Sequence, residues 1–365
     1  MRLGIIGLAG AGKTTVFNAV TRGTVTVGAY STHTQPNIGV VRIPDERVDR
    51  LSEMYKPKKT TYATVEYVDF PAGGEAFGKG KGPAGKFVNE LATMDALIHV
   101  VRGFEDETNP HPEGSVDIGR DIETMHLELA FIDLGSIDRR IERLKPELRS
   151  MKAGERESQQ KILEVLEKLK GGLEADTPVR DMELSPEEQR ALEGSQFLTA
   201  LPLLVLVNIS DSPLPERESL LEELSGKYAG RDCDVAILSG RFEMELNELS
   251  DDDATEFREA AGITESGMAS AIQAGYSLLG LISFLTVGPD ECRAWTVTSG
   301  ATAPEAAGKI HTDLQRGFIR AEVMGYADLI DAGSEVELKK QGLLRTEGKG
   351  YVVQDGDILN ILFNV

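Results

Sequence analysis

The sequence is poor in cysteine and has no long apolar run. Its two cysteines, Cys233 and Cys292, lie far apart, and neither has another Cys or a His at metal-ligand spacing. Neither a disulfide framework nor a zinc site is therefore indicated, and a reducing compartment fits best. No apolar stretch approaches the roughly 18–20 residues of a membrane span. The apolar start at residues 3–6 leads directly into a glycine-rich loop, unlike a signal peptide. We expect a cytoplasmic protein with no membrane partner.

Positive charge is also scarce. The formal net charge is −21, from 39 Lys and Arg against 60 Asp and Glu. A field of this sign repels phosphate backbones and anionic membranes, so a contact with nucleic acid needs a local basic patch. The 41% hydrophobic content is that of a globular protein. Because 365 residues are too many for one ordinary core, we expect two or three domains.

One motif indicates a phosphate site near the N-terminus. Residues 7–14 read Gly-Leu-Ala-Gly-Ala-Gly-Lys-Thr, the pattern G-x-x-x-x-G-K-S/T, with a strand-like run before it and a helix-like run after it. Glycines allow consecutive N–H groups to face phosphates, and the helix N-terminus adds partial positive charge. We expect this loop to bind a nucleoside triphosphate through Gly10, Ala11, Gly12, Lys13, Thr14 and Thr15.

Two of these side chains have specific roles in such a site. Lys13 would neutralise the β- and γ-phosphate oxygens, and Thr14 would ligate Mg²⁺ through its hydroxyl. Asp69 ends a predicted strand at residues 64–69 and is the natural carboxylate for the water shell of the ion. The sequence therefore predicts a magnesium site beside the phosphate loop.

Short apolar runs alternate with glycine-rich or polar stretches, which is typical of α/β domains. Six runs have the character of strands: residues 3–7, 37–42, 64–69, 96–102, 201–207 and 235–238. The fifth is almost wholly apolar, as expected for a parallel strand buried on both faces. We predict a Ras-like nucleotide-binding domain of the α/β class, interrupted between the fourth and fifth strands.

The interruption differs in kind from the rest. Apolar residues recur at helical spacing amid dense charge, from Ile122 to Leu148 and again from Ile162 to Leu169. We predict two antiparallel helices that turn near Gly154, a hairpin inserted into the α/β domain. Two ordinary helices packed on the sheet are the alternative.

The C-terminal part forms a third region. Short β-like runs at 283–287, 294–297, 351–353 and 359–363 surround one predicted helix over 303–316. The predicted organisation is thus a P-loop domain of residues 1–120 plus 198–280, a hairpin of residues 121–197 and a compact α+β module of residues 281–365.

The base-binding segment is only partly diagnostic. Residues 208–211 read Asn-Ile-Ser-Asp, where Ras-like GTPases have N-K-x-D. Asn208 and Asp211 match that motif, but Ile209 replaces the Lys whose stem would stack on guanine. Ser239, after the next predicted strand, is a further candidate for nucleotide binding. A plain turn or helix cap also accounts for Asn208 and Asp211.

The longest diagnostic runs lie near the C-terminus, at residues 293–296, 300–313, 318–321 and 356–365. With the phosphate loop, the hairpin and the N-x-x-D turn, they make the sequence resemble the Obg-like ATPases, the YchF branch of the TRAFAC GTPases, over almost the whole chain. The resemblance implies that residues 281–365 form a ubiquitin-like TGS domain.

The same resemblance implies slow ATP hydrolysis with Mg²⁺ by a monomer that engages the ribosome or ribosomal RNA. ATP is implied because the family has N-x-x-E here and uses its Asn on the adenine edge. Asp211 stands where that Glu is usual and could still accept hydrogen bonds from guanine, so a GTP-preferring GTPase is an alternative.

Both switch segments depart from the family pattern. Residues 69–73 read Asp-Phe-Pro-Ala-Gly, which puts Ala72 where the family has the glycine whose N–H contacts the γ-phosphate. In the first switch the family Thr aligns with His33, so its neighbour Thr34 is our choice for a metal contact. A binding module with vestigial hydrolysis is therefore a further alternative.

One histidine completes the candidate site. No glutamine follows Asp69 to position an attacking water, and the family shares this lack. Residues 109–117 match a mobile loop of the family that carries a His in its place, so the resemblance implies that His111 orients water or stabilises developing charge. Without the resemblance, a lone His between two prolines is a surface-loop residue.

Overall fold

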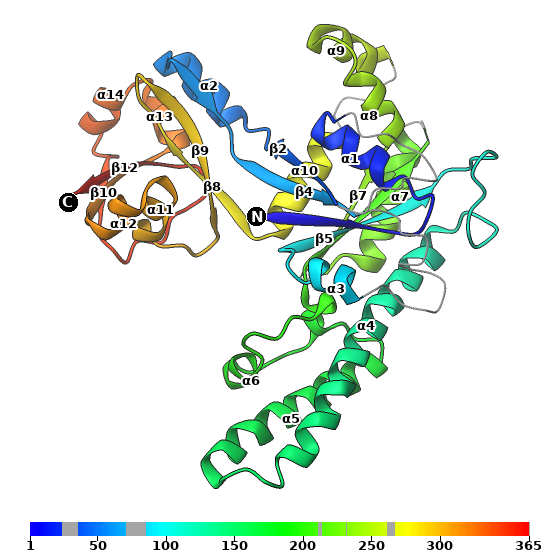
Figure 1. The fold of residues 1–365 in the computed structure, drawn as a ribbon. Coiled ribbons are helices and arrows are strands. Elements are labelled where there is room, and N and C mark those ends of the chain that lie inside the picture. The colour runs from blue at the N-terminus through cyan, green and yellow to red at the C-terminus, as the bar shows by residue number, and fades with distance from the viewer. Residues whose placement is uncertain (24–35, 71–84, 211–213, 231, 261–266, 365) are drawn as a thin grey trace. The chain divides into compact units, whose positions relative to one another are not determined.

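The computed structural model describes residues 1–23, 36–70, 85–210, 214–230, 232–260 and 267–364. Three residues of the predicted nucleotide site, Thr34, Ala72 and Asp211, lie outside these ranges. The chain divides into two compact units, one of Met1–Gly39 and Glu66–Ala274 and the other of Val40–Val65 and Gly275–Val365. Helices surround a sheet in both parts of the chain (Figure 1).

The first sheet has the strand order β2-β4-β1-β5-β6-β7. Its strands are β1 (Arg2–Ile6), β2 (Asn37–Arg42), β4 (Thr64–Asp69), β5 (Ala96–Gly103), β6 (Leu203–Ile209) and β7 (Cys233–Leu238). β1 pairs in parallel with β4 and β5, β5 with β6, and β6 with β7. All of β6 is buried, as its apolar run predicted for a strand covered on both faces. All six predicted strands are confirmed.

Helices pack on this sheet and extend from it. They are α1 (Lys13–Thr21), α3 (Gly85–Leu91), α4 (Ile118–Glu147), α5 (Ala153–Glu174), η1 (Val179–Asp181), α6 (Pro186–Ala191), η2 (Leu198–Ala200), α7 (Leu214–Tyr228), α8 (Gly240–Leu246), α9 (Asp251–Ala260) and α10 (Gly267–Leu278). Met125 and Leu129 of α4 join Leu97 and Val205 of the strands in one buried core. Among the helices of the described ranges, none combines the length and apolar character needed to cross a bilayer.

The region between β5 and β6 contains the expected pair of long helices. α4 and α5 run antiparallel, since Lys145 pairs with Glu167 and Lys170 pairs with Asp138 farther toward the base. They share a buried core that includes Ile137, Leu144, Leu166 and Leu169, and Figure 1 shows them projecting from the sheet. Gly154 lies at the start of α5, next to the connection, as predicted.

One buried carboxylate fixes the base of this hairpin. Asp133 of α4 is 2% exposed and accepts hydrogen bonds from the backbone N–H groups of Leu198 and Thr199, at 3.0 and 2.8 Å, and from the Thr199 hydroxyl at 2.7 Å. Burial raises the pKa of the Asp133 carboxyl, while these hydrogen bonds oppose the rise. Asp133 thus ties α4 to the segment that leads into β6.

We expect Asp133→Ala to lower the free energy of unfolding by about 2–4 kcal/mol, because two buried N–H groups and a hydroxyl lose their acceptor. Urea denaturation followed by circular dichroism measures this loss. Asp138→Ala, on the same helix but 47% exposed in its pair with Lys170, should cost less than about 0.5 kcal/mol. Equal losses in the two variants would contradict this role of Asp133.

The second sheet has the order β11-β10-β12-β8-β9-β3. Its strands are β3 (Lys59–Thr61), β8 (Leu281–Thr286), β9 (Glu291–Thr298), β10 (Phe318–Gly325), β11 (Arg345–Glu347) and β12 (Asp357–Phe363). The accompanying helices are α2 (Glu46–Tyr55), α11 (Ala303–Ile310), α12 (Thr312–Arg316), α13 (Tyr326–Ala332) and α14 (Glu335–Lys340). Phe284, Ala306 and Val323 lie in its core.

Two details predicted for this region are wrong. The helix expected over 303–316 is broken at His311, whose backbone is extended and whose Nδ1 caps α12 by accepting a hydrogen bond from the Asp313 N–H at 3.2 Å. Residues 351–353 form no strand, because Val352 makes only an isolated bridge with Thr302.

Residues 40–65 belong to the second unit by their contacts. β3 pairs in parallel with β9, and Arg47 donates to Asp45 at 2.8 Å and to Asp355 at 2.7 Å. The contacts of this segment therefore group it with residues 275–365, whereas its sequence pattern groups it with residues 1–120.

Candidate functional site

The phosphate loop runs from the end of β1 to the first turn of α1, and glycine is required in it. Gly12 has φ of +87°, and a Cβ there would lie 2.3 Å from Nδ2 of Asn208. Gly7 has φ of +150°, and a Cβ there would lie 2.3 Å from the Val100 carbonyl oxygen. Side chains at these positions would displace the loop from its neighbours.

Lys13 lies half-buried at the start of α1. Its Nζ donates to the carbonyl oxygens of Gly7 at 2.9 Å and Leu8 at 3.0 Å, so the ammonium folds back over the loop. Burial lowers the pKa of Lys13 to about 8, against the opposing charge of Asp69. Carbonyl dipoles solvate the ammonium without neutralising it, and the loop therefore keeps a positive charge for an anion.

Thr14 and Asp69 meet beside Lys13. The Thr14 hydroxyl donates to Oδ2 of Asp69 at 3.0 Å. Asp69 is 2% exposed, and among the described residues its Oδ1 accepts no hydrogen bond of good geometry, although the Asn37 side chain lies nearby. Burial raises the pKa of Asp69, and Thr14, Lys13 and Asn37 oppose the rise. A hydroxyl beside a buried carboxylate with an open oxygen is a donor set that fits Mg²⁺.

Asn208 contacts the phosphate loop through Ala11. It lies near the end of β6, just before Ile209, and is 4% exposed. Its Nδ2 donates to the Ala11 carbonyl at 3.1 Å, and its Oδ1 accepts from the Gly240 N–H at 3.0 Å. Both ends of the amide are thus engaged within the protein. Asn208 fixes the loop relative to the start of α8.

The other base-side candidates have different surroundings. The Ile209 side chain is 5% exposed and packs in the core of the first sheet. Ser239 is the N-cap of α8, and its Oγ accepts from the Phe242 N–H at 3.4 Å. Thr15 lies in the first turn of α1, with its Cγ2 facing Gly240. Thr15 and Ser239 therefore lie with Asn208 where α1 and α8 begin.

His111 is not an exposed loop residue. Its side chain is 2% exposed, with Nε2 at 2.8 Å from Oδ2 of Asp121 in the first turn of α4. Nδ1 accepts a hydrogen bond from the Glu113 N–H at 3.2 Å. The expectation of a surface side chain is wrong, because the contact with α4 is not visible in the local pattern.

Arg102 and Asn109 lie near the phosphate loop but were not predicted as site residues. Arg102 is the residue before the last in β5 and is 1% exposed. It donates to the carbonyl oxygens of Phe104 at 3.0 Å and Asn109 at 2.8 Å. A Cβ on Gly10 would lie 3.2 Å from Nη1 of Arg102 and 3.0 Å from Nδ2 of Asn109. An arginine within a largely apolar predicted strand was the available signal.

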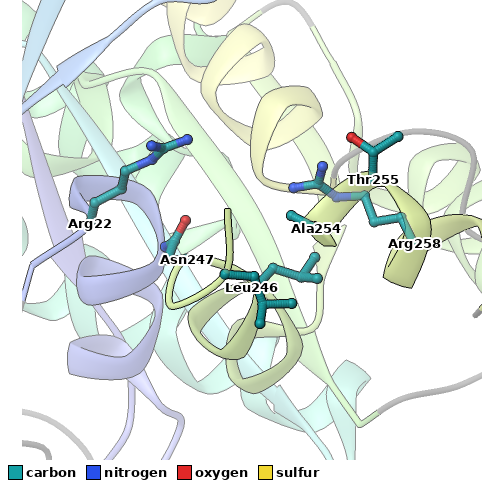
Figure 2. A pocket seen from close by; sticks show the side chains of 7 residues that line it. Arg22, Leu246, Asn247, Ala254, Thr255 and Arg258 are labelled. Atoms are coloured by element: carbon teal, nitrogen blue, oxygen red, sulfur yellow. The ribbon is translucent and has the colours of Figure 1, made fainter. Parts of the chain in front are cut away.

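A separate cavity lies away from this site. It has a volume of about 130 Å³, and Arg22, Leu246, Asn247 and Arg258 are among its lining residues (Figure 2). Asn247 donates from Nδ2 to the Ala19 carbonyl at 2.8 Å. The cavity is thus at the C-terminal ends of α1 and α8, whereas the phosphate loop and Ser239 lie at their N-terminal ends.

Comparisons with known proteins match both the N-terminal and the C-terminal parts of the chain. The family model described as "50S ribosome-binding GTPase" matches residues 2–168, and the model of the YchF GTPase C-terminal region, described as "Protein of unknown function", matches residues 281–364. The "Ribosome-binding ATPase YchF" of Bacillus subtilis is 38% identical over 99% of each chain. Its Haemophilus influenzae counterpart is 40% identical over 100% of this chain and 99% of its own.

A solved structure extends the likeness to three dimensions. The YchF GTPase of Schizosaccharomyces pombe is 30% identical, with a TM-score of 0.82 over 99% of this chain and 97% of that one. The resemblance inferred from the sequence is thus confirmed. With a P-loop domain at its N-terminus and similarity along its whole length, this chain belongs to the YchF family.

Proposed function

We propose that this chain is a slow, Mg²⁺-dependent ATPase that acts as a nucleotide-controlled switch on the ribosome. The meeting of Lys13, Thr14 and Asp69 at the end of the phosphate loop carries the proposal. The relatives from B. subtilis and H. influenzae are named ribosome-binding ATPases, which supports both the activity and the partner. We place the protein in the cytoplasm as a monomer.

Each side chain of the loop has a defined task in this proposal. The Lys13 ammonium now donates to the carbonyl oxygens of Gly7 and Leu8. In the nucleotide complex it would donate to phosphate oxygens in their place, and its side chain would move little because it already lies over the loop. Thr14 would turn its hydroxyl from Asp69 to Mg²⁺, and Asp69 would hold a water of the ion. Bound Mg²⁺ would neutralise charge on the phosphates. Thr34 is the proposed third oxygen.

The base is read next to Asn208. Because the Asn208 amide is engaged by Ala11 and Gly240, we assign it the task of shaping the site. Base selection then depends on Ser239, the Ile209 backbone and Asp211. ATP is the proposed nucleotide, in line with the relatives named ATPases. The S. pombe relative is titled a GTPase, so GTP is the second candidate.

Hydrolysis requires a group that orients the attacking water, and His111 is the proposed one. The phosphate loop alone binds nucleotide without supplying this group. A nucleotide-dependent binding module without turnover is the alternative function. It has the same loop geometry and differs in showing no release of phosphate.

Binding to ribosomes is expected to depend on the nucleotide state. Co-sedimentation with purified ribosomes should recover at least about threefold more protein with a nonhydrolysable ATP analogue than with ADP, because the γ-phosphate adds contacts that ADP lacks. A Lys13→Met variant supplies the matched control, since it should lose the difference. No sedimentation in either state would contradict the proposed partner.

A further inference from the structure

The Asp121 carboxylate, the Arg120 guanidinium and the Glu113 backbone surround the His111 ring in this structure. The His111 ring has Asp121 at Nε2 and the Glu113 N–H at Nδ1. Nη2 of Arg120 lies 3.4 Å from the same Nδ1, and Oδ2 of Asp121 lies 2.8 Å from Nε2, a contact without good hydrogen-bond geometry. Neither nitrogen is left for a water molecule, so His111 in this position cannot orient an attacking water.

Asp121 is itself firmly placed. Its side chain is 2% exposed, and Arg120 donates to Oδ1 from Nε at 3.0 Å and from Nη2 at 2.8 Å. It lies in the first turn of α4, where the helix dipole favours a carboxylate, and Asp117 caps that helix by accepting from the Arg120 N–H at 2.9 Å. The carboxylate that faces His111 is therefore a fixed partner.

Arg120 also fixes the segment after His111. Its guanidinium donates to the Ser115 carbonyl at 2.6 Å and to the Ser115 hydroxyl at 3.2 Å. Arg120 thus joins the far end of the loop to the same helix turn that holds the ring. Release of His111 requires loss of its Asp121 contact, while the loop end can remain on Arg120.

The near end of the loop lies against the phosphate loop. Arg102 binds the Asn109 carbonyl, and the Asn109 amide lies 3.0 Å from where a Cβ on Gly10 would be. His111 follows Asn109 by two positions, a span of at most about 7 Å of extended chain. A released His111 is consequently within reach of a nucleotide on Gly10 and its neighbours.

We propose that Asp121 is a positioning residue that holds the His111 ring away from the nucleotide and so limits the rate of ATP hydrolysis. In this proposal the ring alternates between Asp121 and the attacking water. This inference rests on the proposed role of His111 in ATP hydrolysis. Asp121 is the group that restrains His111, and the restraint lowers kcat.

The test measures kcat and KM for ATP in purified full-length variants. Asp121→Ala is expected to raise kcat about tenfold, the effect of losing one contact to a charged group, with KM nearly unchanged. Asp121→Asn keeps the size of the side chain and should raise kcat by a smaller factor. Glu123→Ala is the matched control, because it removes an acid from the same helix at a 54% exposed position and should leave kcat unchanged.

A double-mutant cycle distinguishes restraint of His111 by Asp121 from a purely structural role of Asp121. In a His111→Ala background, the Asp121→Ala change should have no effect on kcat, since the group it restrains is gone. A lowered or unchanged kcat in both Asp121 variants, with thermal melting showing folded protein, would overturn the proposal. If His111→Ala alone leaves kcat unaltered, the catalytic role of His111 fails and the restraint by Asp121 fails with it, whereas an altered kcat in His111→Ala with no gain in the Asp121 variants overturns the restraint alone.

Discussion

Lys13→Met is expected to weaken ATP binding about 10–150-fold, the range for losing hydrogen bonds to a charged group. The methionine keeps the length of the side chain but has no donor for phosphate oxygens. Because the pKa of Lys13 is about 8 before an anion binds, the affinity of the unmodified protein should also fall as the pH rises above that value, where the ammonium deprotonates. Isothermal titration with ATP and Mg²⁺ measures both effects.

A lysine outside the site provides the control for Lys13. Lys145 on α4 is 55% exposed and pairs with Glu167, so Lys145→Met removes the same charge without touching the loop. Its ATP affinity should be that of the unmodified chain. A Lys13→Met protein that binds ATP within twofold of the unmodified chain, with an intact melting transition, would contradict the assignment of the phosphate site.

Gly12→Ala is expected to reduce ATP affinity about 100-fold or more, since it combines two costs. Alanine at φ of +87° is strained by roughly 1–2 kcal/mol, and its Cβ would lie 2.3 Å from Nδ2 of Asn208. The clash forces Asn208 off the Ala11 carbonyl or moves the loop. Either movement shifts the backbone N–H groups that face the phosphates.

Gly300 separates these two costs. It also has φ of +87°, but a Cβ there meets nothing within 4 Å. Gly300→Ala therefore has the backbone strain without the clash, and it should lower the melting temperature slightly while leaving ATP affinity unchanged. Comparable losses of ATP affinity in both variants would show that the contact between Gly12 and Asn208 has no role in binding.

Local chemistry explains which parts of the fold were predictable. The phosphate loop is specified by glycines and a lysine within residues 7–14, and the strands are specified by their own apolar runs. By contrast, residues 40–65 join the second unit through a pairing of β3 with β9, for which the segment has no local signal. The break at His311 depends on a side-chain cap that competes with helix propensity.

The candidate site divides in the same way. Lys13, Thr14 and Asp69 come together because the carboxyl ends of parallel strands β1 and β4 meet at one edge of the sheet, which the pattern could predict. The burial of His111 could not be predicted, since it depends on how α4 begins relative to the loop. Arg102 was not predicted because its hydrogen bonds to the carbonyl oxygens of Phe104 and Asn109 have no counterpart in a pattern of charged residues.

In this YchF family member we propose that the phosphate loop supports Mg²⁺-dependent hydrolysis of ATP. Single-turnover hydrolysis of radiolabelled ATP and GTP, each with Mg²⁺ and with EDTA, tests it most directly. We predict slow release of phosphate from ATP with Mg²⁺, little release from GTP, and none with EDTA or in the Lys13→Met variant. Faster turnover of GTP would contradict the proposed nucleotide, and binding of ATP without any release of phosphate would contradict the ATPase itself.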